Sequence, residues 1–128
     1  MADLEGIKKA NKLISEIRSL QMKAFAFIAK TSMTRDDESL SLEDLDQFQE
    51  ANYELAFVSA EISAAEAFIG RASQLDSLVN QMALCFMVEI LNRSINRFLR
   101  ISQSVGLDDN EITSFYGNSD YTALRSKY

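Results

Sequence analysis

The sequence contains no histidine, and this absence excludes several familiar kinds of enzyme site. Histidine is the commonest general base, it activates serine and cysteine nucleophiles, and it supplies ligands in helical di-iron sites. The four glycines stand alone at positions 6, 70, 106 and 117, so no glycine-rich phosphate-binding loop is present. We therefore expect a protein that is not an enzyme and that uses no cofactor.

Proline is also absent, and with only four glycines the backbone has few places to turn. A chain of 128 residues is enough for one domain with one core. Apolar residues recur at helical spacing in every long segment, and no segment alternates with a period of two beside turn residues. The sequence therefore predicts an all-α fold made of a few long helices.

Cysteine occurs once, at Cys85, so no internal disulfide can form, which is typical of proteins from a reducing compartment. Because apolar residues surround Cys85 in the sequence, we expect its thiol to pack in the core. The first residues include Asp3 and Glu5 rather than the basic start of a signal peptide. The most apolar run, residues 78–91, is too short and too polar to span a bilayer. We expect a cytoplasmic protein with no membrane span.

Three long helices are predicted, followed by a short fourth. Asp3 caps the first helix at residues 3–30, and Ser41 opens the second helix at 41–69 after a polar loop at 31–40. Ser73 with Asp76 caps the third helix at 73–105, and Asp108 caps the short helix at 108–116.

Gly70 and Gly106 are placed to end the second and third helices in the left-handed conformation. The short connection at Gly70 predicts an antiparallel hairpin of the second and third helices. We expect an antiparallel bundle domain at residues 1–116. Residues 117–128 are predicted to form a loose C-terminal tail, which would either fray or dock onto an apolar groove.

The second helix carries two apolar stripes. The main stripe has the spacing of a core face, and a second stripe on another side contains Tyr53, Phe57, Ala60, Ala64 and Phe68. The small residues in it would allow a neighbouring helix to approach closely.

The apolar face of the third helix changes sides along its length. Leu75, Val79, Met82, Phe86 and Ile90 share one face, and we expect this face to contact the first two helices. The opposite face carries Leu84, Val88, Leu91, Ile95 and Leu99. Either the helix kinks near residues 92–94 and its far half folds back onto the same core, or it stays straight and its far half packs on another subunit. Without proline the straight helix is the favoured prediction.

The resulting hypothesis is a bundle completed by oligomerisation, most simply a homodimer. The residues predicted to contact a partner or to form the oligomer interface are Tyr53, Phe57, Phe68, Leu84, Val88, Leu91, Ile95, Phe98 and Leu99.

Acidic residues are concentrated in the middle of the chain. Residues 31–70 contain ten Asp or Glu and one Arg, whereas residues 1–30 and 71–107 have a small basic excess. The acidic second helix should therefore lie between two mildly basic helices. Six of the acidic residues lie close together but lack the glycine and spacing of a calcium-binding EF-hand loop, so no metal site is predicted: Asp36, Asp37, Glu38, Glu43, Asp44 and Asp46.

Arg93, Arg97 and Arg100 form the only concentrated basic stripe on a helix. Three uses are open: ion pairs with the acidic second helix, contact with the phosphates of a nucleic acid, or contact with an acidic patch on another protein. The net charge of −6 and the lack of an aromatic platform beside the arginines disfavour nucleic acid.

These observations favour a non-enzymatic protein–protein interaction module: an adaptor, a chaperone-like escort or a small structural subunit of a larger complex. Its partners would be itself and another protein, with no membrane. The alternative is a helical subunit that contacts nucleic acid through the arginine stripe within a larger assembly.

Overall fold

A computed structural model describes residues 3–32 and 48–128. The predicted all-α fold is confirmed, since the described residues form helices and contain no strand. The elements are α1 (Leu4–Ser32), α3 (Gln49–Ala72), α4 (Ser77–Ile101), α5 (Asp109–Thr113), a 3-10 helix η1 (Ser114–Gly117) and α6 (Ser119–Lys127). The predicted cap at Ser41 and the acidic cluster at 36–46 lie outside the described residues.

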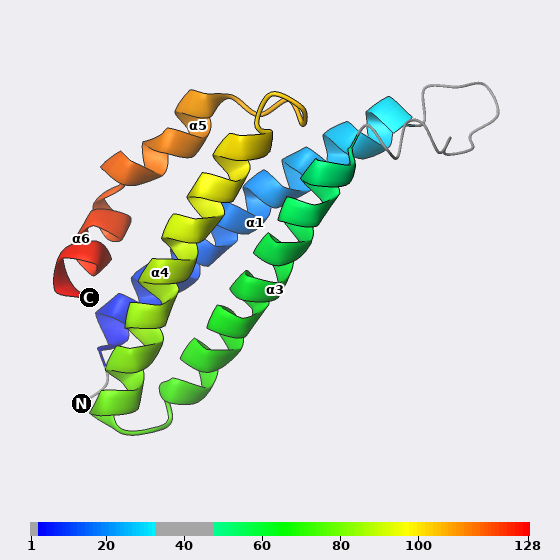
Figure 1. Ribbon diagram of the computed structural model, residues 1–128. Coiled ribbons are helices and arrows are strands. Elements are labelled where there is room, and N and C mark those ends of the chain that lie inside the picture. Colours follow the sequence, from blue (N-terminus) through cyan, green and yellow to red (C-terminus); the bar gives the residue numbers. More distant parts are fainter. Residues whose placement is uncertain (1–2, 33–47) are drawn as a thin grey trace.

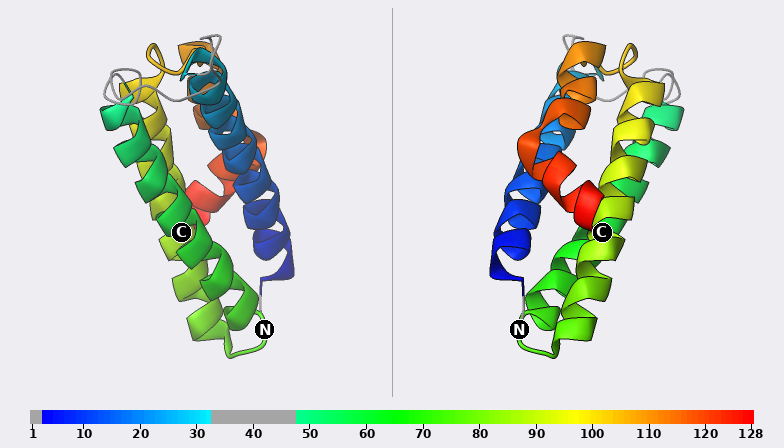
Figure 2. Two further views of the ribbon diagram at one scale, coloured as in Figure 1. Left: turned by 90° about the vertical axis from the view of Figure 1, so that its right-hand side faces the viewer. Right: turned by 90° about the vertical axis from the view of Figure 1, so that its left-hand side faces the viewer.

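The three long helices α1, α3 and α4 lie side by side (Figure 1), and each contacts the other two. α3 and α4 are joined by a short connection and pack against each other in antiparallel directions. The chain then turns back through α5 and η1, so that α6 packs on both α1 and α4, as Figure 2 shows. The segment after Ile101 thus adds three short helices, α5, η1 and α6, beside the three long ones.

α1 begins as predicted, because the Asp3 carboxylate accepts a hydrogen bond from the Gly6 backbone N–H (2.9 Å). The connection between α3 and α4 differs from the prediction. Gly70 lies inside α3, and Ser73 follows the end of that helix, where its hydroxyl donates to the Gly70 carbonyl. Asp76 alone caps α4 by accepting from the Val79 N–H. The C-terminal turn of α3 closes without a left-handed residue, so glycine is not required at position 70.

Gly106 has the predicted left-handed conformation, with φ of 67°. α4 ends at Ile101, and the Leu107 N–H donates to the Ser102 carbonyl across the turn, as in a Schellman motif. Asp108 then caps α5 as predicted, by accepting from the Asn110 N–H. The short predicted helix is divided into α5 and η1.

Residues 119–127, predicted to be a loose tail, form α6. The Asn118 side chain caps this helix by accepting from the N–H groups of Asp120 and Tyr121. Tyr121 and Leu124 are almost fully buried. The prediction of a loose tail was wrong because two apolar residues one turn apart are enough to anchor a nine-residue helix on α1 and α4.

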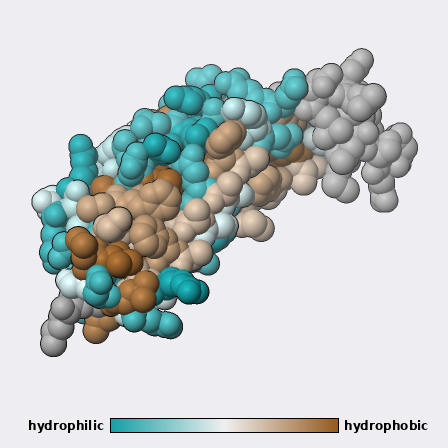
Figure 3. All heavy atoms as spheres, turned by 60° about the horizontal axis from the view of Figure 1, so that its bottom comes forward, coloured by the Kyte–Doolittle hydropathy of each residue, from teal (hydrophilic) through white to brown (hydrophobic). Residues whose placement is uncertain are grey.

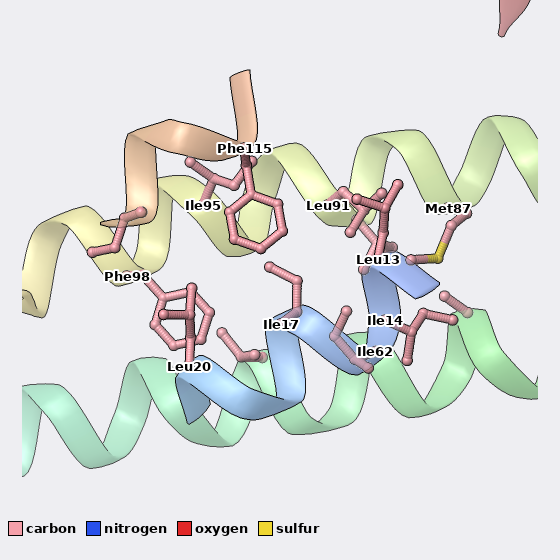
Figure 4. Packing of buried hydrophobic residues seen from close by; sticks show 14 of the residues in the cluster. Leu13, Ile14, Ile17, Leu20, Ile62, Met87, Leu91, Ile95, Phe98 and Phe115 are labelled. Carbon is pink, nitrogen blue, oxygen red and sulfur yellow. The ribbon is translucent and has the colours of Figure 1, made fainter. Parts of the chain in front are cut away.

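The core is built from all of these helices. Figure 4 shows side chains of α1, α3 and α4 meeting along one line, with Phe115 of η1 closing over Ile17 and Ile95. Ten residues of α4 are buried, and Ala83, Ile90 and Ile95 flank a row of seven. The seven are spaced alternately by four and three residues: Asn80, Leu84, Met87, Leu91, Ser94, Phe98 and Ile101. This spacing is that of a single coiled-coil seam.

α4 therefore does not switch its buried side. It is continuous through residues 92–94, and Leu75 and Met82, expected to face the other helices, are more than half exposed. The spacing of apolar residues in the sequence predicted the wrong buried face. Two polar residues, Asn80 and Ser94, occupy seam positions, while large apolar residues lie on the solvent side.

Candidate functional site

The outer side of α3 is the most unusual surface of the molecule. We define the outer face of α3 as Tyr53, Ala56, Phe57, Ala60, Ala64 and Ala67, all of which are exposed. The core residues of the same helix, such as Leu55, Val58 and Ile62, lie on the opposite side. At 3.6 residues per turn, no charged side chain between Glu50 and Arg71 lies within about 60° of the midline of the outer face. α3 is therefore apolar on both sides.

A second apolar surface lies where α3 connects to α4. We call Leu75, Leu78 and Met82 the turn patch, and their side chains are 53, 66 and 54% exposed. Half-buried Phe86 of α4 contacts Phe68 of α3, with ring centroids 6.0 Å apart. Figure 3 shows apolar residues gathered toward this end of the molecule and continuing in a paler band across it.

The aromatic end of the outer face is held by contacts within the chain. The ring centroids of Tyr53 and Phe57 lie 4.9 Å apart. The guanidinium carbon of Arg97 lies 4.6 Å from the centre of the Phe57 ring, a cation–π contact that fixes one side of that ring. The other edge of Phe57 remains open, and Phe57 lines a shallow apolar hollow with Ala56 and Ala60.

Arg97 also joins α4 to α3 through ion pairs. Its Nη1 donates to Glu54 (2.7 Å) and its Nη2 to Glu61 (3.0 Å), while Nη1 of Arg100 lies 3.4 Å from Glu54. Glu54 is only 6% exposed. Its hydrogen bond to Arg97 is the main reason that the pKa of the guanidinium is raised, although burial opposes the shift.

One further ion pair, between α1 and α3, follows the predicted charge pattern, whereas Arg93 pairs within α4. Arg93 pairs with Glu89 on its own helix, one turn away (2.8 Å), and Arg18 of α1 pairs with Glu66 of α3 (3.2 Å). The acidic helix is thus paired with a basic helix on each side, as expected. Of the three uses considered for the arginine stripe, pairing with the acidic second helix is the one present in the chain.

The residues predicted to contact a partner fall into three groups. Tyr53 and Phe57 are exposed on the outer face of α3. Phe68, Val88 and Leu99 are half-buried against the chain's own core. The remaining four are completely buried within the chain: Leu84, Leu91, Ile95 and Phe98.

Those four buried residues are the correction to the predicted interface. Leu84, Leu91 and Phe98 belong to the seam of α4, and Ile95 is buried beside it, so no partner can reach them while the chain is folded. The C-terminal segment, expected either to fray or to dock onto an apolar groove, packs on α1 and α4. Of the residues predicted to contact a partner, the two that are exposed therefore both lie on α3.

A polar cavity of about 390 Å³ lies where the two ends of the described chain meet α4. The Asp3 carboxylate accepts from Lys127 (2.8 Å) and from the Tyr128 hydroxyl (2.6 Å), and the Asp3 N–H donates to Asn80 (3.0 Å). The bonds from Lys127 and Tyr128 hold the pKa of Asp3 far below its ordinary value. Cys85, expected in the core, is exposed and lines this cavity.

Comparisons of the chain with protein-family models, curated proteins and solved structures find no match. Within residues 3–32 and 48–128 no helix is long and apolar enough to cross a membrane. The same residues contain no group of three or more acidic or cysteine side chains arranged to hold a metal ion.

Proposed function

We propose that the protein is a non-enzymatic protein–protein interaction module that works as a homo-oligomer, most simply a dimer. The observation that supports this proposal is the outer face of α3. A helix on the surface of a monomer normally turns charged and polar residues to water. The outer face of α3 instead exposes two aromatic rings and four alanines over most of the helix length.

Burial of this surface is what favours association. Contiguous apolar patches on soluble proteins mark interaction sites, because each Å² removed from water contributes roughly 25 cal/mol. The turn patch is a separate apolar surface, and it supports a role in which a different protein also binds. An adaptor, a chaperone-like escort or a small structural subunit would each use the protein in this way.

Multi-angle light scattering over about 1–100 μM protein tests the proposal, since dimers of typical affinity form in this range. We expect a mass near twice 14.4 kDa that falls on dilution. Ala64→Glu should lower the fraction of dimer because it places a charge on the outer face of α3 without touching the core. Ser15→Glu, which adds the same charge at an exposed position of α1, is the matched control. A wild type that is monomeric throughout would refute homo-oligomerisation.

The second candidate function is contact with nucleic acid through Arg93, Arg97 and Arg100. Together with Asn96, these residues line a surface hollow of about 240 Å³, and this observation favours an anionic ligand. It ranks second because each arginine already contacts a glutamate. A salt-dependent gel shift that is lost in Arg93→Gln would favour it. Unchanged mobility of nucleic acid at low salt would remove it.

A further inference from the structure

The outer face of α3 has two unlike halves. Along the midline the residues alternate in steps of four and three, in the order Tyr53, Phe57, Ala60, Ala64 and Ala67. The first half is aromatic and the second half is alanine. The helix is about 36 Å long at 1.5 Å per residue, so each half covers roughly 15 Å or more. Steps of four and three are those of a coiled-coil seam.

We propose that two copies of the chain pair through this face, with α3 of one copy antiparallel to α3 of the other across a two-fold axis beside Ala60. This arrangement rests on the proposed homo-oligomer and specifies its interface. It places Phe57 opposite Ala64 of the partner subunit, and Tyr53 opposite Ala67 of the partner subunit. Each aromatic half then packs on the partner's smaller half.

Size complementarity selects the antiparallel direction. In a parallel pair the two copies of Phe57 would meet at one end, while alanine would face alanine at the other, and the helices could not be close along their whole length. In the antiparallel pair each large residue meets a small one, so the spacing between the helices is uniform. Uniform close packing gives the greatest contact between the two apolar faces.

The charges at the two ends of the face select the same direction. Glu50 and Arg71 lie at opposite ends of α3, both exposed, and neither has an ion-pair partner within the part of the chain that the structure describes. The antiparallel arrangement brings Glu50 beside Arg71 of the partner subunit, twice by symmetry. A parallel arrangement would bring like charges together at both ends. Such exposed pairs add little affinity but fix orientation.

A second copy is also the partner that this face fits best. A two-fold interface must be complementary to itself, because the same patch is used by both subunits. The outer face of α3 meets this condition in size, since large residues are followed by small ones, and in charge, since an acidic end is followed by a basic end. A face that binds an unrelated protein need not be complementary in size and charge to a second copy of itself.

Disulfide trapping tests the arrangement in full-length protein that carries Cys85→Ser. Ala60→Cys lies beside the proposed axis, so its two copies fall within the 7 Å Cα separation that a disulfide needs. Ala67→Cys lies on the same face but about 20 Å from its own copy along the antiparallel helices. Ser15→Cys on α1 measures crosslinking by random collision. We expect most of the Ala60→Cys protein to form a disulfide dimer under mild oxidation, at least about tenfold more than either other variant.

The outcomes separate this inference from the proposed function. Crosslinking of Ala60→Cys alone supports the antiparallel pair. Crosslinking of both Ala60→Cys and Ala67→Cys indicates a parallel pair, and crosslinking of neither in a protein that light scattering shows to be dimeric indicates another interface. Each of these two results overturns the arrangement while homo-oligomerisation stands. A monomeric wild type overturns both.

Discussion

Two buried polar residues of this protein differ in whether their side chains have hydrogen-bond partners. Glu54 is buried on α3 and accepts hydrogen bonds from two arginines of α4. Ser94 is completely buried in the seam of α4, and its hydroxyl has no hydrogen-bond partner. Glu54 links two helices because its buried carboxylate is hydrogen-bonded. Burial of the Ser94 hydroxyl instead costs desolvation free energy that no hydrogen bond offsets.

Replacement of Glu54 by Gln should lower the free energy of unfolding by about 2 kcal/mol, because the partly buried Arg97 guanidinium loses its nearest negative charge. Glu89→Gln is the matched control. It breaks the exposed pair with Arg93 and should cost less than about 0.5 kcal/mol. Urea denaturation of both variants measures the difference, and equal costs would show that the Glu54 pair contributes no more than a surface pair.

Replacement of Ser94 by Ala should raise the free energy of unfolding by about 1 kcal/mol, because it removes a buried hydroxyl without a partner. Ser15→Ala on the exposed side of α1 controls for the better helix propensity of alanine. Thermal unfolding of the two variants gives the comparison. If Ser94→Ala is no more stable than Ser15→Ala, the hydroxyl is satisfied in solution, for example by a buried water molecule.

At the scale of elements, the turn after α4 directs α5, η1 and α6 back along the molecule. Its backbone reverses at Gly106, where a Cβ atom would lie 2.6 Å from the Phe27 ring of α1. Both the positive φ and this close approach therefore require glycine. The turn fixes the start of α5, and α6 then buries Tyr121 and Leu124 against α1 and α4.

Gly106→Ala should lower the free energy of unfolding by about 2 kcal/mol or more, from left-handed strain plus displacement of Phe27. Gly117→Ala is its control, since Gly117 has no positive φ and a Cβ atom there meets nothing within 4 Å. We expect the Gly117 variant to stay within about 0.5 kcal/mol of wild type. Chemical denaturation monitored by circular dichroism distinguishes them, and a neutral Gly106→Ala would contradict the proposed constraint.

At the scale of the whole molecule, Asp3 connects three elements that are distant in sequence. It caps α1, contacts Asn80 of α4 through its backbone and accepts hydrogen bonds from Lys127 and Tyr128. Because its pKa is lower in the folded chain than the ordinary 3.8, the ionised carboxylate stabilises the fold above about pH 4. That contribution is lost as the pH falls below this value toward the folded pKa.

Asp3→Asn should therefore lower the free energy of unfolding at pH 7 by about 1 kcal/mol, since asparagine caps a helix equally well but carries no charge. The difference from wild type should shrink progressively below pH 4. Asp76→Asn, at the exposed cap of α4, is the control and should change little. Denaturation curves at pH 7 and pH 3 provide the measurement. A difference that is the same at both pH values would show that the charge of Asp3 is not involved.

Local signals in the sequence determined the all-α fold and many of the helix ends. The lack of proline, the helical spacing of apolar residues, and the caps at Asp3 and Asp108 act within one or two turns of the chain, so they can be recognised without knowledge of the fold. The acidic second helix between basic neighbours was also predictable, since opposite charges on adjacent helices attract. The second apolar stripe of α3 could also be recognised from the sequence, because the helical spacing of apolar residues is a local signal.

Only the tertiary structure decided which of several apolar faces is buried. Leu84, Leu91, Ile95 and Phe98 lie in the core, whereas Leu75, Leu78, Met82 and Cys85 are exposed, although all of them are apolar. Burial depends on where α1, α3 and α6 lie around α4, and polar Asn80 and Ser94 are buried because their positions on α4 face the other helices. Hydrophobicity alone carries no information about neighbours that come from distant parts of the chain, so the outer face of α3 could be identified as unpartnered only once those neighbours were in place.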